Sequence, residues 1–369
     1  MEDTCIGFIG FGLIGGSIAR ALKSKNQAAK LIAYNYHIGK PNASLELAKS
    51  DGVLDRIVTS FDNGFENCDI IFLCAPVLDN IKYLSQLKAI LKPSCILTDV
   101  GSVKGNIHKA VSNLGLEDHF IGGHPMAGTE KTGYEHSMTT LLENAYYVLT
   151  PTKLTTEAAL SKLISIVSLT GAIPVILDPD YHDDIVSAIS HVPHIISASL
   201  VNMVKDHDDK NETMRLLAAG GFKDITRISS SSPIMWQNIC LTNKDSILRF
   251  LHYYIEKLTY IQTYIEDQDH DKLLGFFEEA KSYRDQIPTK SVGLIQKVHE
   301  LYLDLMDEEG AIATVATILA TNHISIKNIG IIHNREFEDG VLRLELYTEE
   351  GAIKAAKCLR NYNYTIYER

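Results

Sequence analysis

Near its beginning the chain reads Cys5-Ile6-Gly7-Phe8-Ile9-Gly10-Phe11-Gly12-Leu13-Ile14-Gly15-Gly16-Ser17. An apolar, strand-like run leads into a glycine-rich turn, and a helix-like segment follows. In a dinucleotide-binding strand, turn and helix, one glycine allows the tight turn, a second lets the backbone approach a pyrophosphate, and a third lets helix and strand pack closely. Gly10, Gly12 and Gly15 have the required spacing. The free N–H groups at the start of the helix would face the phosphates, so the segment predicts a dinucleotide-binding fold.

The composition is that of an ordinary globular protein. The chain has 369 residues, of which 45% are hydrophobic and 22% charged, and this length predicts two or three domains. The net charge of −11 argues against a nucleic-acid or anionic-membrane partner. No apolar stretch reaches the roughly 18 residues of a membrane-spanning helix, and no signal-type leader precedes the first strand. We therefore expect neither export nor a membrane span.

The cysteines are scattered and form no CxxC pair. Several lie in apolar, strand-like runs, so we interpret them as reduced thiols of a cytoplasmic protein. The six are Cys5, Cys68, Cys74, Cys95, Cys240 and Cys358.

Strand-like and helix-like segments alternate from residue 1 to about 172. This alternation predicts an α/β fold in which a doubly wound, parallel, Rossmann-type sheet has its ligand sites outside the carboxyl ends of the strands. Ala75-Pro76, Gly101-Ser102 and Gly123-His124 fall at such ends. The strands are expected near 5–9, 30–34, 69–74, 95–100, 146–150 and 173–177, and helices near 44–50 and 78–91.

The first domain is predicted to span residues 1–172, and two further domains are expected after it. The second is a substrate and dimerisation domain at 173–287, which would cover the cofactor-bearing edge of the sheet. From about 178 the strand pattern gives way to long amphipathic helices, with apolar residues at helical spacing between Ile247 and Ile265. After a linker, 297–369 has the order strand, helix, strand, strand, helix, strand. That order predicts a ferredoxin-like βαββαβ unit.

Asn35 bears on the choice of cofactor. It stands twenty residues after Gly15, where an acidic residue usually contacts the ribose 2′-hydroxyl. An asparagine can bond the hydroxyl without repelling a 2′-phosphate, but no arginine follows and the nearest cation is Lys40. We favour NAD over NADP.

His124 is the strongest candidate for catalysis. It lies among glycines in Gly122–Glu130, at the edge of the expected cofactor crevice, where packing explains it poorly. A histidine with an ordinary pKa accepts a proton at neutral pH. Ser102, in Asp99–Lys104, has two interpretations: a helix N-cap, or a hydroxyl beside the nicotinamide.

The segment Ser190-His191-Val192-Pro193-His194 sits inside a helical pattern. Ser190 and His194 are four residues apart and share a helix face. Pro193 removes a helix hydrogen bond, which suits a substrate-facing kink. No third ligand stands at a convincing spacing for a metal, so no metal site is predicted.

Arg227 is the last candidate. It lies in a largely uncharged stretch near serines and Trp236, the only tryptophan. It is typical of a carboxylate clamp, although a surface arginine paired with Asp224 is the alternative.

Taken together, these segments resemble the prephenate dehydrogenase family of tyrosine biosynthesis, along the whole chain. Gly10–Gly16, Asp99–Lys104, Gly123–Gly128 with Glu130, Ser190–His194, and Phe222–Arg227 with Pro233–Trp236 stand in the family's order. The C-terminal unit resembles an ACT domain, which senses free amino acids. Two residues depart from the pattern: Asn35 stands where an acid is usual, and Glu309 where the ACT turn normally has proline.

The resemblance implies a role for each of these residues. His124 and Ser102 would be catalytic and contact the ring hydroxyl of the substrate. Substrate binding is implied for Ser190, His194, Arg227, His191, Glu130, Asp224 and Trp236. Cofactor binding is implied for Gly10, Gly12, Leu13, Ile14, Gly15, Asn35, Ala75 and Pro76. Binding of an amino-acid effector is implied for Glu309, Gly310, Ala311 and Asn328.

The implied reaction is the NAD-dependent oxidation and decarboxylation of prephenate to 4-hydroxyphenylpyruvate. A homodimer that is inhibited by tyrosine through the ACT domain is expected, although this domain could instead only extend a dimer interface. An arogenate or NADP-using dehydrogenase of the same family remains an alternative, and so does a non-catalytic amino-acid sensor with a vestigial nucleotide fold. A 3-hydroxyacid dehydrogenase would need a catalytic lysine in the helical domain, and none is placed there.

Overall fold

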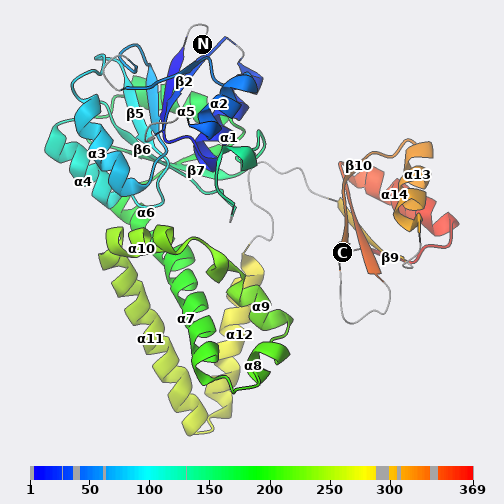
Figure 1. Ribbon diagram of the computed structural model, residues 1–369. Helices are drawn as coiled ribbons and strands as arrows, with labels where there is room; N and C mark the ends of the chain where they lie inside the picture. Colours follow the sequence, from blue (N-terminus) through cyan, green and yellow to red (C-terminus); the bar gives the residue numbers. More distant parts are fainter. Residues whose placement is uncertain are drawn as a thin grey trace. The chain divides into compact units, whose positions relative to one another are not determined.

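The computed structural model of the protein (Figure 1) describes residues 4–26, 28–35, 42–60, 64–129, 131–287, 299–305, 309–332 and 340–368. The chain divides into two compact units, Met1–Thr289 and Lys290–Arg369. Each unit is described by itself.

The first unit is built on a parallel sheet. Its five strands, β1 (Cys5–Ile9), β2 (Lys30–Tyr34), β3 (Arg56–Ile57), β4 (Ile70–Leu73) and β5 (Ile96–Asp99), lie in the order β3-β2-β1-β4-β5. All neighbouring pairs are parallel. This is the strand order of a dinucleotide-binding fold, with the order reversing at β1 and β4.

The strands that follow β5 differ in number and direction from those predicted. A bridge from Leu97 to Phe120 leads to β6 (Ile121–Pro125), and β6, β7 (Tyr146–Pro151) and β8 (Ile173–Ile176) form a second, three-stranded sheet. Because β7 runs antiparallel to β6, the expectation of an entirely parallel sheet is wrong here. The strands β3 and β6 were not predicted, since β3 has two residues and the two glycines and proline of β6 weaken a strand pattern. Strand β8 lies beyond the predicted boundary at residue 172 but belongs to this sheet.

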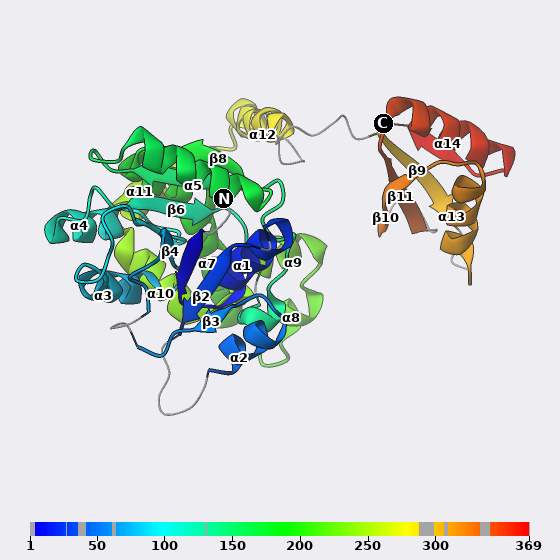
Figure 2. The same ribbon diagram turned by 90° about the horizontal axis from the view of Figure 1, so that it is seen from above.

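Helices cover both faces of the first sheet (Figure 2). Side chains of α1 (Leu13–Lys25), α2 (Ala43–Ser50) and α5 (Glu157–Leu169) share one buried cluster with Phe8. The helices α3 (Val77–Leu87) and α4 (Gly105–Leu114) share another with Ile9. Successive residues of β1 therefore point to opposite faces, and each face buries its own core.

The rest of the first unit is helical (Figure 1). A nearly continuous helix runs through α6 (Pro179–Val186), the π-helical turn η3 (Ser187–His191) and α7 (Val192–His207). It is followed by α8 (Thr213–Leu217), α9 (Gly220–Thr226), the 3₁₀ turn η4 (Arg227–Ser230), α10 (Pro233–Thr242), α11 (Lys244–Glu266) and α12 (His270–Gln286). Helix α11 packs against α6, α7 and α12.

The continuous helix Pro179–His207 is long and apolar enough to cross a membrane by length and composition alone. It differs from a spanning helix in burying polar side chains against the rest of the unit, including Asp183, Ser187 and His191. These groups are hydrogen-bonded within the protein. The core helix of a globular protein meets the same composition test.

The second unit is a small sheet with two helices on one side of it (Figures 1 and 2). Its elements are β9 (His299–Leu305), α13 (Ala311–Thr321), β10 (Ile326–Ile332), β11 (Gly340–Leu346), α14 (Glu349–Asn361) and β12 (Ile366–Glu368), in the chain order predicted from the sequence. The strands are antiparallel, in the order β10-β11-β9-β12. Apolar residues of both helices and of the strands form its core.

Candidate active site

The glycine-rich turn between β1 and α1 has the geometry of a phosphate-binding turn. Gly10 has a φ of +85°, and a Cβ there would lie 2.4 Å from the backbone nitrogen of Ala75, which follows β4. A Cβ on Gly15 would lie 2.9 Å from the carbonyl oxygen of Gly10. A Cβ on Gly12 would meet nothing within 4 Å. Two glycines are thus needed for packing, and the third leaves open space at the start of α1.

The start of α1 fits an anionic ligand. Gly12 is the N-cap of the helix, and no side-chain hydrogen bond from the part of the chain that the structure describes caps it, so the N–H groups of the first turn are available to a phosphate. Leu13 and Ile14 form that first turn and are half-buried. The described residues around the turn therefore fit the diphosphate of a dinucleotide.

Two asparagines hold the loops around this turn. The side-chain oxygen of Asn35 accepts a hydrogen bond from the backbone N–H of Phe11, which ties the end of β2 to the turn. The buried Asn80, which the sequence analysis did not single out, donates to the carbonyls of Leu73 and Ala75 and accepts from the N–H of Ala75. It shapes the loop that carries Ala75 and the exposed Pro76. Lys40 lies outside the described residues.

A buried ion pair lies at the end of β5. The ammonium of Lys104 contacts the carboxylate of Asp99, and both side chains have no exposed surface. Lys104 Nζ also donates to the carbonyl of Gly123 at 2.7 Å, while Asp99 accepts from the N–H of Gly123 at 3.0 Å. Burial lowers the pKa of Lys104, and Asp99 opposes this shift. The pair fixes the backbone of β6 at the residue before His124.

His124 lies at the head of a chain of three side chains. Its Nδ1 lies 2.8 Å from Nε2 of His182, and Nδ1 of His182 lies 2.9 Å from the carboxylate of Asp183. His182 and Asp183 come from α6 and are buried. Asp183 also accepts the backbone N–H groups of Lys104 and Gly105, both at 2.8 Å. One carboxylate therefore orients a histidine and caps the start of α4.

The hydrogen bonds of this chain determine its tautomers. A carboxylate only accepts, so Nδ1 of His182 carries the proton and its Nε2 is the acceptor. Nδ1 of His124 must then donate to that acceptor. The remaining nitrogen, Nε2 of His124, has a lone pair and can take a proton from a ligand.

Burial holds His124 in this neutral form. Burial, together with the charges of His182, Lys104 and His191, holds the pKa of His124 well below its ordinary value of 6.5. His124 is therefore a base at neutral pH.

Ser102 lies in the turn between β5 and α4 and is half-buried. It is not the N-cap of α4: the N-cap is Lys104, and its capping contacts come from Asp183. The N-cap interpretation of Ser102 is therefore wrong, because a carboxylate distant in sequence occupies that role. Val103, beside it, packs in a buried cluster with residues of α7, α10 and α11.

The segment 190–194 contains a π-helical turn in place of a simple proline kink. The N–H of Val192 bonds the carbonyl of Ser187, five residues back. Such a turn in an α-helix is frequent at functional sites. Ser190 is exposed, whereas His191 and His194 are buried.

Trp236 and Asn243 bring the histidines of this segment into a common cluster. The ring of His194 stacks on Trp236 at 3.5 Å, and His191 meets the same indole edge-on at 6.0 Å. The amide nitrogen of Asn243 donates to Ser187 and to the carbonyl of Asp183, and it lies 3.2 Å from Nδ1 of His191. Through Asp183 the cluster is continuous with the chain behind His124.

Arg227 and Asp224 are exposed, on η4 and α9. Their segment is fixed to α7 by Ser197, whose hydroxyl lies 2.6 Å from that of Ser229 and donates to the carbonyl of Ile225. Ser197 stands three residues after His194. Glu130 lies outside the described residues.

Sequence reasoning missed the residues that support this site: Asn80, Asp99, Lys104, His182, Asp183, Ser197 and Asn243. The signal that most of them share is a polar side chain in an otherwise apolar, buried segment, as at Asp99 after Ile96-Leu97. His182 and Asp183 lack this signal, because they lie among the acidic residues of 178–184.

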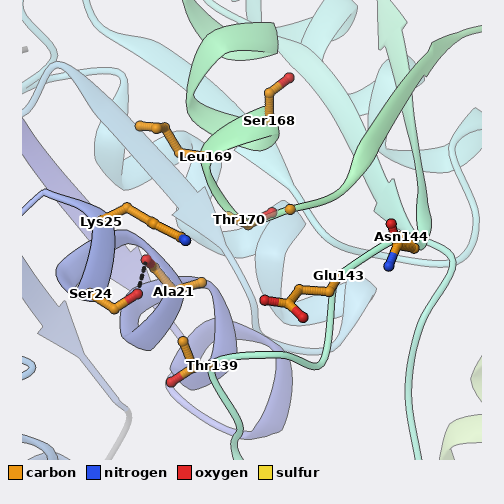
Figure 3. Close-up of a pocket in the computed structure, with 10 residues that line it drawn as sticks. Ala21, Ser24, Lys25, Thr139, Glu143, Asn144, Ser168, Leu169 and Thr170 are labelled. Atoms are coloured by element: carbon orange, nitrogen blue, oxygen red, sulfur yellow. Dashed lines mark hydrogen bonds between the residues drawn. The ribbon is translucent and has the colours of Figure 1, made fainter. Parts of the chain in front are cut away.

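A cavity of about 380 Å³ lies away from these residues, against the last turns of α1 and α5 (Figure 3). The side chains of Lys25 and Glu143 line it, and the hydroxyl of Ser24 bonds the carbonyl of Ala21. It contains none of the predicted site residues.

The four predicted effector residues lie in the second unit. Gly310 begins α13 with a φ of +87°, and among the described residues no side-chain hydrogen bond caps the helix. Glu309 is exposed and Ala311 buried. Asn328 is exposed on the edge strand β10, at a register shift.

Comparisons with known proteins identify the family. Residues 18–176 match the family described as "Prephenate dehydrogenase, nucleotide-binding domain", and residues 178–279 match "Prephenate dehydrogenase, dimerization domain". The prephenate dehydrogenase of Bacillus subtilis (strain 168) is 38% identical over 361 residues, which cover 97% of this chain and 96% of that protein.

Solved structures are similar as well. Prephenate dehydrogenase from A. aeolicus, in complex with hydroxyphenyl propionate and NAD⁺, has a TM-score of 0.72 and 30% identity, covering 78% of this chain and 99% of that one. Synechocystis arogenate dehydrogenase has a TM-score of 0.69 and 31% identity, covering 77% and 100%. Since the two family matches span most of the first unit and a relative of 38% identity spans nearly the whole chain, the chain belongs to the prephenate dehydrogenase family.

Proposed function

We propose that this protein oxidises and decarboxylates prephenate to 4-hydroxyphenylpyruvate, with NAD as hydride acceptor. The observation that carries the proposal is the chain His124–His182–Asp183, which leaves a neutral histidine with one nitrogen free to accept a proton. Family membership supports the substrate. A vestigial, non-catalytic nucleotide fold has no use for such a buried chain.

The protein's part in the reaction is proton transfer and positioning. The turn Gly10–Gly15 would hold NAD, which would supply the hydride acceptor for the ring carbon. His124 Nε2 takes the hydroxyl proton of the substrate, and the carboxylate of Asp183 stabilises the resulting imidazolium through His182. Ser102 holds the hydroxyl oxygen. The ring then loses its carboxylate as CO₂ and becomes aromatic, which makes the step effectively irreversible.

The carboxylates of prephenate need donors, and we assign these to the helical part of the unit. Ser190, His194 and Arg227 would face the ring carboxylate and the pyruvyl group, with His191, Asp224 and Trp236 in support and Glu130 beside the substrate. The fixed position of the segment 225–229 against α7 supports this assignment.

NAD is favoured over NADP by the end of β2. Asn35 contributes no cation, and its oxygen is already bonded to Phe11, so nothing described there would attract a 2′-phosphate. Leu13, Ile14, Ala75 and Pro76 would line the path of the dinucleotide.

One assay tests the proposal. The appearance of reduced nicotinamide is followed by absorbance with prephenate or arogenate, each with NAD or NADP. The proposal expects the highest kcat/KM for prephenate with NAD. A higher value with arogenate would overturn the substrate, a higher value with NADP would overturn the cofactor, and no turnover in any combination would favour the sensor.

We also propose that the second unit is a ferredoxin-like ACT domain that binds tyrosine and reduces activity. Its chain order, its sheet order and the uncapped start of α13 at Gly310 support this, because free N–H groups at a helix start can hold a ligand carboxylate. Glu309, Ala311 and Asn328 would complete the site. Calorimetry with tyrosine, phenylalanine and tryptophan tests the proposal, and no binding of any of them would leave the unit a structural role.

We further propose a cytoplasmic homodimer formed through the helical part of the first unit. Large apolar side chains are exposed there, among them Leu248, Ile255 and Ile265 of α11, and a helix that exposes several large apolar side chains often forms an interface. Sedimentation measures the mass of the assembly, and a monomer at micromolar concentration would contradict the proposal.

A further inference from the structure

Two cysteines of the first unit lie within reach of each other. Cys5 opens β1 and Cys68 precedes β4, and their sulfur atoms are 3.7 Å apart although 63 positions separate them in sequence. The backbone holds both in place: the N–H of Asp69 donates to the carbonyl of Cys5 at 2.8 Å, and the N–H of Cys5 donates to the Asp69 carboxylate at 2.9 Å.

The two cysteines lie in a tightly packed part of the sheet. A Cβ on Gly7, two residues along β1, would lie 2.7 Å from the ring of Phe65 and 3.0 Å from Sγ of Cys68, so the backbone of β1 and the Phe65 ring hold Cys68 beside Cys5. A disulfide has an S–S length of about 2.05 Å, so the distance of 3.7 Å between the two sulfur atoms must shorten by roughly 1.7 Å. Parallel pairing of β1 with β4 continues from Ile6 and Ile70 onward.

The two thiols differ in reactivity. A hydrogen bond from Cys68 lowers the pKa of Cys5 to about 7, helped by Arg56 and Lys92 and opposed by burial and Asp69. The same hydrogen bond, with burial, raises the pKa of Cys68. Cys5 is half-buried and Cys68 fully buried. Cys5 is therefore the thiol that reacts with a solute, and Cys68 the one that follows.

We propose that Cys5 and Cys68 form a reversible disulfide by exchange with a low-molecular-weight disulfide. The Cys5 thiolate attacks one sulfur of the small disulfide, whose S–S bond breaks and releases one thiolate, which takes a proton from solvent. The Cys68 sulfur then attacks the Cys5 sulfur, the bond from Cys5 to the small sulfur breaks, and the Cys68 proton passes to that departing sulfur, which leaves as the second small thiol. Two protein thiols are oxidised and one small disulfide is reduced to two thiols.

The bond would lock the sheet without blocking the candidate active site. It joins the starts of β1 and β4, whereas the ends of the same strands carry Gly10 and Ala75. Closing a long loop restricts the unfolded chain. Oxidation should therefore raise the Tm of the first unit by several degrees and leave turnover of the enzyme within about twofold.

The test uses the full chain and oxidised glutathione. The reduced protein has six free thiols, and the proposal expects four after oxidation, with peptide mapping that joins Cys5 to Cys68. In Cys68→Ser the exchange stops half-way, so one glutathione should remain on Cys5. Cys358→Ser, in the second unit, is the matched control and should lose two thiols as the wild type does.

Several results would overturn the proposal: six thiols retained by the wild type, a bridge through Cys95, or no adduct on Cys68→Ser. Alkylation by iodoacetamide gives a second measurement that needs no variant. The half-buried Cys5 should be modified before the fully buried Cys68, and earlier modification of Cys68 would exclude Cys5 as the attacking thiol.

Discussion

The two halves of the candidate active site are built in different ways. The cofactor half is backbone: Gly10 and Gly15 bring the turn against Ala75 and Cys74, and the open position at Gly12 leaves the start of α1 accessible. The proton-transfer half is a set of buried side chains, in which His124 depends on His182 and Asp183 from a helix 58 residues away. The first half needs glycine at fixed spacing within one short turn, whereas the second needs hydrogen bonds between side chains from distant segments.

The proton-transfer half should respond most strongly to loss of its base. Replacing His124 by Asn should lower kcat by roughly 10²–10⁴ while NAD binding stays nearly intact. Steady-state kinetics and calorimetry with NAD measure the two effects. His136→Asn, at an exposed position of the same unit, is the control and should behave as the wild type. Near-normal turnover of His124→Asn would remove this residue from the mechanism.

Asp183 tests whether the far end of the chain sets the tautomer. In Asp183→Asn an amide N–H can donate to Nδ1 of His182, whose proton then lies on Nε2 instead. Nε2 of His182 would donate to Nδ1 of His124, so the proton of His124 would lie on Nε2, the nitrogen that must accept the substrate proton. We expect kcat to fall by roughly 10²–10³. Asp184→Asn is the control, since Asp184 bonds Ser246 and Arg249 instead.

A double variant separates this role from simple loss of structure. Once His124 is Asn, the change at Asp183 should lower kcat little further, because residues that act as one unit are not additive. Full additivity, with equal rate losses in both backgrounds, would show that Asp183 only caps α4.

The cofactor half should separate into packing and binding effects. Gly10→Ala adds a left-handed backbone penalty and a clash with Ala75, so we expect a loss of roughly 2–4 kcal/mol in the free energy of unfolding. Gly12→Ala meets open space, so stability should change by less than about 0.5 kcal/mol while NAD affinity falls. Gly52→Ala, which has a φ of +73° and no neighbour within 4 Å, isolates the backbone penalty. If Gly10→Ala destabilised no more than Gly52→Ala, the packing argument would fail.

The contrast also explains what the sequence could predict. The glycine turn, the strands β1, β2, β4 and β5, and the order of elements in the second unit follow from local patterns. The antiparallel direction of β7 did not, because the two glycines and the proline of β6 weaken its strand pattern. The roles of His182 and Asp183 also could not be predicted. The local sequence does not distinguish a buried, hydrogen-bonded histidine and carboxylate from the same residues at a solvent-exposed helix end. Their partners are identified only when α6 packs against β6 and α4.

Buried histidines make the proton-transfer half sensitive to acid. Burial lowers the pKa of His191 from 6.5 to about 4, with His182 and His194 in the same direction and Asp183 opposing. Between these values the unfolded chain binds a proton that the folded chain does not, so stability present above pH 6.5 is lost as the pH falls towards 4. His191 alone would contribute up to about 3 kcal/mol.

Urea unfolding of the wild type and of His191→Asn across this pH range measures that contribution. Asparagine retains an acceptor for Asn243 but does not titrate, so the variant should lose less stability between pH 6.5 and 4 than the wild type. His136→Asn, whose imidazole is exposed, should follow the wild type. Parallel curves for His191→Asn and the wild type would mean that His191 is protonated equally in both states.

Arg227 lies outside both halves. A variant at this position shows whether the substrate site extends along α7 as far as η4. Its segment is anchored by Ser197, one turn after His194, which makes it a candidate to bind a carboxylate beyond the reach of His124. Losing a charge-assisted hydrogen bond of roughly 1.5–3 kcal/mol should raise KM for prephenate by about one to two decades in Arg227→Ala. NAD affinity should not change, because the cofactor half is made of backbone. Lys223→Ala, an exposed cation on α9, is the matched control and should keep a normal KM. A loss of NAD affinity or of folding in Arg227→Ala, with an unchanged KM for prephenate, would place Arg227 outside the substrate site.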